Sequence, residues 1–190
     1  FPAVSYSTNK HNGNYSAELR NTAAGPVNTS STVYNSNEVA GMLFTGNYTG
    51  TTSTSGANGE IKIDEGRSFT VRPTRLRFWH TYEPYGTDTY EVIVKVFDSE
   101  NKVIGAGNHT SSVSTTTWEE VSVDITYTPT SADYVPKAAK IYVFFQSSNA
   151  GQGNVPYEKK RKVTLADYGT ATTHSGSVLR IDDLSLDYNK

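Results

Sequence analysis

The sequence contains no cysteine, so no disulfide bond contributes to its stability. This absence is ordinary in the cytosol and common outside bacterial cells, and it argues against a secreted eukaryotic module of this size. No apolar run approaches the ~20 residues that a membrane-spanning helix needs, so membrane insertion is not expected. Lysine and arginine number 17 against 19 aspartates and glutamates. Because neither sign dominates, nothing indicates nucleic acid or an anionic membrane as a partner.

The chain also lacks any convincing amphipathic helical stripe over a window of about ten residues. Apolar residues instead alternate with polar ones in short runs, and Gly, Pro and Asn separate these runs. Such a pattern is typical of β-strands. The predicted strands cover residues 15–20, 39–45, 61–63, 69–71, 75–82, 90–97, 118–127, 140–146 and 178–188. Many short strands with regular turns predict an all-β fold, an antiparallel two-sheet β-sandwich (jelly roll) with its first and last strands adjacent.

A chain of 190 residues is long enough for one β-domain with its own core. We find no internal repeat and no linker, so residues 1–190 are predicted to form a single domain. The chain opens Phe1-Pro2, with no initiator Met and no signal peptide, and we expect a mature product or a module of a larger protein. Residues 147–176 form a segment too long for a simple turn, either a solvated insertion or the rim of a ligand site.

Two adjacent acids, Asp182 and Asp183, interrupt the apolar pattern of the last strand. Buried carboxylates need compensation. One interpretation is a structural Ca²⁺ site between the two chain ends, because calcium prefers hard oxygen ligands. Its co-ligands would then come from Asn12, Asn14 and Glu18. A second interpretation is hydrogen bonding to backbone amides or an arginine. A catalytic pair is disfavoured, because adjacent side chains on a regular strand point to opposite faces.

The run Arg75-Leu-Arg-Phe-Trp-His-Thr-Tyr82 contains the candidate ligand site. Alternation places Leu76, Phe78, His80 and Tyr82 on a core face and Arg75, Arg77, Trp79 and Thr81 on the other. A tryptophan on an open sheet face can stack on a sugar ring while flanking arginines donate to its hydroxyls or to an anionic group. Trp79 covered by a loop is the alternative.

The strand at 90–97 is expected to lie beside this run and to share the face of Trp79, contributing Glu91, Ile93, Lys95 and Phe97. Further candidate sugar contacts are loop tyrosines, which are Tyr48, Tyr85, Tyr157 and Tyr168.

Several segments in order carry a resemblance to a known family. They are residues 12–19 (Asn-Gly-Asn-Tyr-Ser-Ala-Glu-Leu), 40–46 (Ala-Gly-Met-Leu-Phe-Thr-Gly), 72–73 (Arg-Pro), 76–88 from Leu76 to Asp88, 118 (Trp), 125–127 (Ile-Thr-Tyr) and 176–184 (Gly-Ser-Val-Leu-Arg-Ile-Asp-Asp-Leu). The series resembles the PCMD family, the carbohydrate-metabolism domain of secreted Bacteroidetes proteins, and more broadly galactose-binding-like carbohydrate-binding modules. The resemblance implies a jelly roll at the C-terminal end of an extracellular or cell-surface bacterial protein, with a role in sugar binding.

Three functions follow as hypotheses. The first is a non-catalytic carbohydrate-binding module that holds a glycan by aromatic stacking and hydrogen bonds, as a monomeric unit of a multidomain chain. The second is a structural or adhesion sandwich without sugar affinity. The third is a jelly-roll glycoside hydrolase or polysaccharide lyase. No catalytic residue is assigned, because the sequence has no Gly-x-Ser-x-Gly elbow and its four histidines lack metal-ligand spacing.

Overall fold

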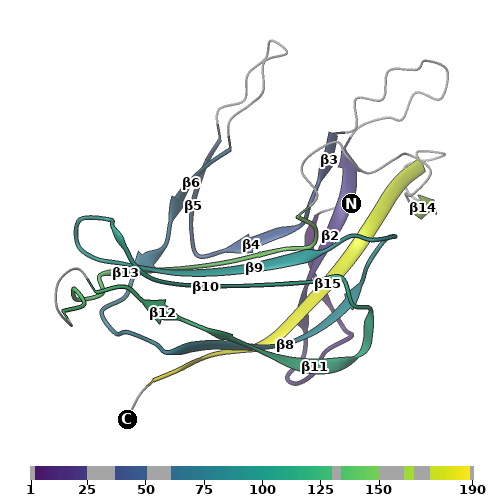
Figure 1. Cartoon of the computed structure of the whole chain (residues 1–190). Helices are drawn as coiled ribbons and strands as arrows, with labels where there is room; N and C mark the ends of the chain where they lie inside the picture. The colour runs from purple at the N-terminus through teal and green to yellow at the C-terminus, as the bar shows by residue number, and fades with distance from the viewer. Residues whose placement is uncertain are drawn as a thin grey trace.

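The computed structural model describes residues 3–24, 37–50, 61–129, 134–149, 161–164 and 172–188. Every regular element in these ranges is a β-strand, and the strands form two packed antiparallel sheets with a separate two-stranded hairpin (Figure 1). The predicted β-sandwich is therefore confirmed. Within the same ranges there is no helix of the length and hydrophobicity that crossing a membrane would require.

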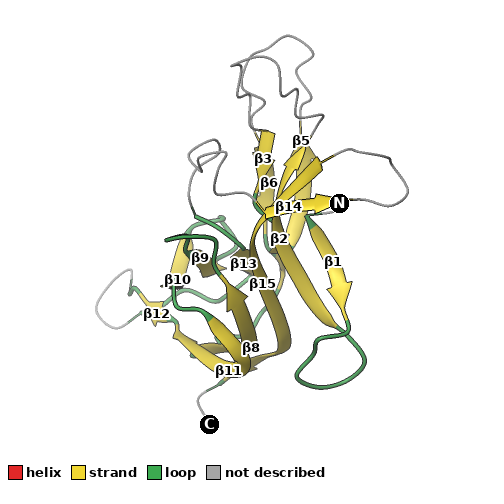
Figure 2. Cartoon of the chain, turned by 90° about the vertical axis from the view of Figure 1, so that its right-hand side faces the viewer, coloured by secondary structure: helices red, strands yellow, loops and turns green. Residues whose placement is uncertain are grey.

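One sheet has seven strands and contains both ends of the described chain. Its main path is β1 (Val4–Ser7), β2 (Ser16–Ala24), β15 (Thr172–Asp187), β8 (Arg75–Glu83) and β11 (Thr115–Asp124), with β3 (Asn37–Val39) paired to β2 and β14 (Arg161–Thr164) paired to β15. The long C-terminal strand β15 runs between β2 and β8 (Figure 2). The first predicted strand, at 15–20, corresponds to β2, so its expected adjacency to the last strand is confirmed; β1, which the sequence did not predict, lies beyond β2.

The other sheet has six strands. Its path is β12 (Thr126–Tyr127), β10 (Val103–Ser111), β9 (Tyr90–Phe97), β13 (Lys140–Gln146) and β4 (Met42–Phe44), with β7 (Arg67–Ser68) paired to β13. The separate hairpin pairs β5 (Gly46–Gly50) with β6 (Ile61–Glu65).

The core lies between the two large sheets. Leu76, Phe78 and Tyr82 of β8 are fully buried and His80 is 4% exposed, so the predicted core face of this strand is confirmed. Across the sandwich, Phe78 packs edge-on against Phe145 of β13, with 5.1 Å between ring centroids. Strand β9 contributes alternate buried valines. The other face of β8, which carries Trp79, therefore points away from the core.

Several strand predictions are wrong. The predicted strand at 39–45 is divided between β3 and β4, and the one at 118–127 between β11 and β12, with the two parts in different sheets. Residues 69–71 are not a strand; the pairing to β13 is made just before them, by β7. The segment at 84–89 crosses from one sheet to the other, so β9 is not a neighbour of β8. Glu91 and the alternate residues that follow it on β9 therefore do not share the face of Trp79.

Candidate functional site

The outer face of the seven-stranded sheet carries a cluster of three rings. Trp79 of β8 and Trp118 of β11 are both half-buried, and they are the two tryptophans of the sequence. The loop of residues 8–15, which joins β1 to β2, brings His11 to the same place. We call His11, Trp79, Trp118, Asp182 and Asp183 the aromatic site.

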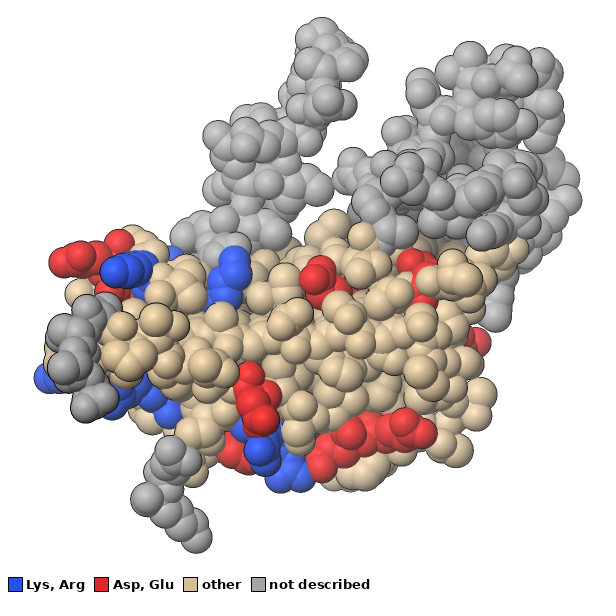
Figure 3. Space-filling view, viewed as in Figure 1, with Lys and Arg blue, Asp and Glu red and all other residues tan. Residues whose placement is uncertain are grey.

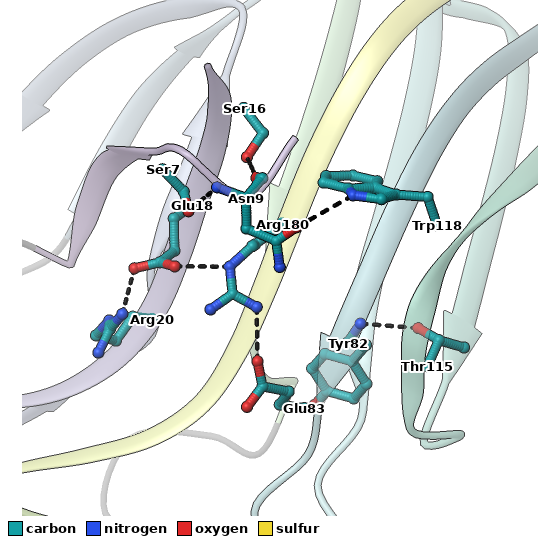
Figure 4. A network of polar contacts seen from close by, with 10 residues as sticks. All are labelled: Ser7, Asn9, Ser16, Glu18, Arg20, Tyr82, Glu83, Thr115, Trp118 and Arg180. Atoms are coloured by element: carbon teal, nitrogen blue, oxygen red, sulfur yellow. Dashed lines mark hydrogen bonds and ion pairs between the residues drawn. The ribbon is translucent and has the colours of Figure 1, made fainter. Parts of the chain in front are cut away.

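His11 covers one side of Trp79. The imidazole and indole rings are stacked, with 3.8 Å between centroids and 8° between planes. Trp118 also lies near His11, with 6.2 Å between ring centroids and 55° between planes, and its Nε1 donates a hydrogen bond of 3.3 Å to Asn9 Oδ1 in the same loop (Figure 4). Thr81, two residues from Trp79 on the same face, is 1% exposed. The face around Trp79 is therefore covered by a loop, which was the alternative interpretation of the sequence.

A β-bulge turns the side-chain carboxylates of Asp182 and Asp183 toward this loop. The register of β15 against β8 gains one residue between Asp182, opposite Trp79, and Ser185, opposite Arg77. Asp183 has φ 46°, in the left-handed region that aspartate tolerates better than most residues. Adjacent residues alternate only on a regular strand, so the expectation that the two acids face opposite ways is wrong.

Asp182 fastens the loop through backbone amides. Its Oδ2 accepts hydrogen bonds from the N–H groups of His11 (2.9 Å) and Asn12 (3.1 Å), and its Oδ1 accepts one from the N–H of Asp183 (2.9 Å). A carboxylate with three such donors is well compensated. This arrangement matches the structural interpretation of Asp182.

Asp183 orients the imidazole. Its Oδ2 lies 2.6 Å from His11 Nδ1, and the side chains are 36% and 31% exposed. A carboxylate on Nδ1 fixes the ring and favours a proton there, so that in the neutral ring Nε2 is the accepting nitrogen. The site thus offers acceptors beside aromatic surfaces.

The predicted calcium ligands do not fit a metal ion in this arrangement. Asp182 receives N–H donors, and Glu18 is 7% exposed and paired with Arg20 and Arg180. Asn12 presents its N–H to Asp182, and its Oδ1 accepts from Gly13 N. Across the described residues, no group of three or more His, Cys, Asp or Glu side chains is placed to hold a metal. The calcium site stays a prediction that these contacts do not favour.

The two arginines beside Trp79 are engaged by acids. Arg75 Nε donates to Asp124 Oδ1 at 2.6 Å. Arg77 donates to both carboxylate oxygens of Glu120, at 3.1 and 2.5 Å, and lies 3.7 Å from Asp187. The predicted face is correct for both residues, but each guanidinium is paired with a carboxylate.

The remaining predicted contacts lie away from this site or outside the description. Tyr85 is in the turn after β8, where its backbone N–H donates to Ser177 Oγ at 2.9 Å. Tyr48 lies in β5, and its side chain is outside the described residues, as are Tyr157 and Tyr168 entirely. Asn14 is exposed in the 8–15 loop.

Sequence reasoning missed His11 and Trp118 as site residues. A register shift in β11 between Thr115 and Glu119 hides the alternation that would have placed Trp118 beside Trp79. His11 depends on a contact across 172 positions of sequence, with Asp183. The available signal was the pairing of the two end motifs, which were read as shared ligands of a metal.

A second polar cluster lies inside the sandwich. Tyr90 is fully buried, and its hydroxyl is 3.1 Å from His80 Nε2 and 3.0 Å from His109 Nε2. His80 Nδ1 lies 3.1 Å from the carbonyl oxygen of Glu119, which can only accept, so Nδ1 carries the proton. With His80 neutral, Tyr90 donates to His80 and accepts from His109.

Both core histidines are held neutral by their surroundings. Burial lowers the pKa of His80, although its bond to the Glu119 carbonyl acts in the opposite sense, and burial also lowers the pKa of His109. Below about pH 6.5 the unfolded chain binds protons that the folded chain does not. The free energy of unfolding should therefore be unaffected by these groups above that pH and should decrease below it.

We expect the midpoint of urea unfolding to fall between pH 7 and pH 5, above the range in which most carboxylates titrate, roughly pH 4. His109→Gln, at the half-buried end of the cluster, should make the urea midpoint fall less between pH 7 and pH 5. His80→Gln should have the same effect. If the urea midpoint of both variants falls as much as that of the unmodified chain, other groups cause the acid sensitivity.

The comparisons with known proteins give a fold and no family. No family model matches the chain, and no curated protein matches it in sequence. Among solved structures, a "putative glycoside hydrolase" from Bacteroides thetaiotaomicron aligns with a TM-score of 0.61 and 15% identity, over 100% of this chain and 57% of that one. A second protein of the same description, from Bacteroides vulgatus, aligns with a TM-score of 0.60 and 16% identity, over 97% of this chain and 77% of that one. At these identities the likeness shows a shared β-fold, and the chain spans little more than half of the first protein.

Proposed function

We propose that this chain is a non-catalytic carbohydrate-binding module that holds a glycan at the aromatic site. The observation that carries the proposal is the convergence of both tryptophans and His11 on one partly exposed patch bordered by carboxylates. Aromatic surfaces bind the C–H faces of sugar rings, and carboxylates accept hydrogen bonds from their hydroxyls. The described fold neighbours, both named as glycoside hydrolases, support a role connected with carbohydrate.

The context suggested by sequence fits this role. Two observations support a bacterial extracellular or cell-surface module within a larger chain. Segments of the sequence resemble the PCMD family in the same order, and the fold neighbours come from Bacteroides. Such a module would keep its parent protein close to a glycan. Binding, and not hydrolysis, is favoured because Asp182 and Asp183 are engaged by the 8–15 loop.

In this proposal the three rings have different roles. Trp118 and the open edge of His11 contact the sugar, while Trp79 supports His11 from below. His11 Nε2 and the Asp183 carboxylate accept hydroxyl hydrogens. The pre-docked loop lowers the cost of binding, because its ordering is complete before the ligand arrives.

Screening the chain on a glycan array and measuring the strongest ligand by calorimetry tests the proposal. Trp118→Ala should weaken binding about 30-fold or more, the effect of losing roughly 2 kcal/mol at an aromatic hot spot. Its melting temperature should change little, because Trp118 is half-buried at the surface. Tyr6→Ala is the matched control, since Tyr6 is 74% exposed on β1 and stands outside the aromatic site.

The outcome for His11→Ala separates two uses of the same site. Weaker binding would show that His11 is part of the sugar platform; stronger binding would show that its ring occupies the ligand position on Trp79. Binding that survives Trp118→Ala and is lost in Tyr6→Ala would move the site to the exposed Tyr6–Tyr15 pair, whose ring centroids lie 4.9 Å apart. Release of reducing sugar from the ligand would support the hydrolase alternative, and no binding at all would support the structural one.

A further inference from the structure

Four arginines with described side chains on the outer face of the seven-stranded sheet, Arg20, Arg75, Arg77 and Arg180, are each paired with carboxylates. Arg75 and Arg77 bind Asp124 and Glu120, as described above. Arg180 on β15 donates to Glu18 at 2.8 Å and to Glu83 at 2.6 Å, and Arg20 on β2 also pairs with Glu18 (Figure 4). These guanidiniums therefore have their charge balanced within the sheet, including the two nearest the aromatic site.

Arg77 is the cation closest in sequence to Trp79 on this face, and it is held firmly. The hydrogen bonds that Arg77 donates to Glu120, together with the charge of that carboxylate, raise the pKa of the Arg77 guanidinium. The two-pronged geometry uses the planar fork of arginine, which is also the geometry by which arginine recognises carboxylates and phosphates. An incoming anion would have to displace Glu120 to reach Arg77.

The groups left to face a ligand are acceptors. Glu120 lies directly opposite Trp79 in the β11–β8 register, and its side chain is 33% exposed. Asp183 is 36% exposed beside His11. In the view of Figure 3, a run of acidic side chains lies at the lower right edge of the molecule, where Figure 1 places β11, and a basic group lies beside it. Among the described side chains around the aromatic site carboxylates therefore predominate, and Lys10, the cation of the 8–15 loop, donates to the Gly13 carbonyl oxygen.

We infer that the aromatic site selects neutral or amino-bearing glycans and rejects uronate and sulfated ones. This inference rests on the proposed glycan-binding function. Hydroxyl and ammonium groups donate to the Glu120 and Asp183 carboxylates, whereas an anionic substituent meets like charge, and the described guanidiniums of this face already have carboxylate partners. Selection comes from the acid partners of the arginines, and not from the rings.

Pairs of polysaccharides of different charge test the selection. Dextran is compared with dextran sulfate, galactan with polygalacturonate, and acetylated with partly deacetylated chitin oligosaccharides, at about 0.15 M salt to suppress non-specific attraction. In the dextran and galactan pairs, the neutral member should bind at least tenfold more tightly than the anionic one. Deacetylated oligosaccharides should bind at least as well as acetylated ones.

Glu120→Gln provides the matched variant, because it removes the charge that neutralises Arg77 and keeps the shape of the side chain. It should narrow the ratio of neutral to anionic affinity at least threefold. Asp187→Asn removes the more distant acid beside Arg77 and should shift the ratio in the same direction by a smaller amount. It is the substitute variant if Glu120→Gln folds poorly. Asp124→Asn makes an equal charge change beside Arg75, about 13 Å along the strand from Trp79, and should leave the ratio unchanged.

The possible results lead to different conclusions. Equal or tighter binding of the anionic members by the unmodified chain, lost in Trp118→Ala, would overturn the charge selection and leave the proposed function standing. An equal shift of the ratio in Glu120→Gln and Asp124→Asn would also overturn it, because selection would then follow net charge and not Arg77. Failure to bind any member of any pair overturns the proposed function, and the inference with it.

Discussion

Asp88→Ala should lower the free energy of unfolding by about 4 kcal/mol, because it leaves several buried donors without an acceptor. Asp88 lies in the segment that crosses from β8 to β9 and is 8% exposed. Its Oδ1 accepts from Thr89 N at 3.0 Å and from Ser148 Oγ at 2.5 Å. Its Oδ2 accepts from Asn21 Nδ2 at 3.0 Å and from Ser177 Oγ at 2.6 Å.

These partners come from different parts of the sandwich. Asn21 is on β2 and Ser177 on β15, both in the seven-stranded sheet, while Ser148 follows β13 of the six-stranded sheet. Ser147, next to Ser148, donates to Asn21 Oδ1 at 2.6 Å and extends the network. Asp88 therefore ties the two sheets together at this end, and its loss should be felt by the whole domain.

Urea unfolding of Asp88→Ala, Asp88→Asn and Asp98→Ala measures this effect. Asp88→Asn should cost about 2 kcal/mol, because an amide keeps the shape but presents a donor to groups that already donate. Asp98 is the matched control, since it accepts from the N–H groups of Glu100 and Lys102 in a half-exposed turn and should cost about 1 kcal/mol. Equal losses for Asp88→Ala and Asp98→Ala would contradict the role assigned to the buried network.

The regular strands could be predicted from the sequence because their side chains alternate. The predicted strand at 90–97 is β9 and the one at 140–146 is β13, with the same bounds. Strand β10 was missed, since it contains Gly105 and Gly107, whose lack of side chains weakens the pattern. The structure explains both glycines: a Cβ would lie 2.6 Å from the Tyr127 ring at Gly105 and 2.3 Å from the Asp124 carbonyl oxygen at Gly107.

The candidate site was predicted less well, because irregular backbone builds it. Alternation correctly placed Trp79, Arg75 and Arg77 on the outer face. It could not place Asp183, which sits on a bulge, or Trp118, which lies within a register shift. The partners of the arginines depend on which strands are neighbours, and the sequence was wrongly read as placing β9 beside β8. Alternation along one strand thus predicts the face on which a side chain lies. Its ion-pair partners on other strands can be predicted only when the order of the strands in the sheet is known.

Gly41→Ala should destabilise the domain by about 3 kcal/mol, the upper part of the range for an overpacked site. A Cβ at Gly41 would lie 2.3 Å from the Ala3 carbonyl oxygen and 2.4 Å from Arg20 N. These two atoms are hydrogen-bonded to each other at 2.9 Å, so the methyl group would press on a bond that joins the start of the chain to β2. Backbone atoms cannot rotate away as the end of a flexible side chain can.

Gly41 cannot move away either. Its N–H donates to Ser147 Oγ at 2.9 Å and its carbonyl oxygen accepts from Ser147 N at 3.0 Å. Gly13→Ala is the matched control, because Gly13 has φ 63° with nothing within 4 Å of an added Cβ, and the change should cost about 1 kcal/mol of backbone strain alone. Gly41→Ala should therefore have a lower melting temperature and a lower free energy of unfolding in urea than Gly13→Ala. The reverse order would mean that β1 and β2 can separate from Gly41 at little cost, and that the loop carrying His11 is held mainly by Asp182 and Asp183.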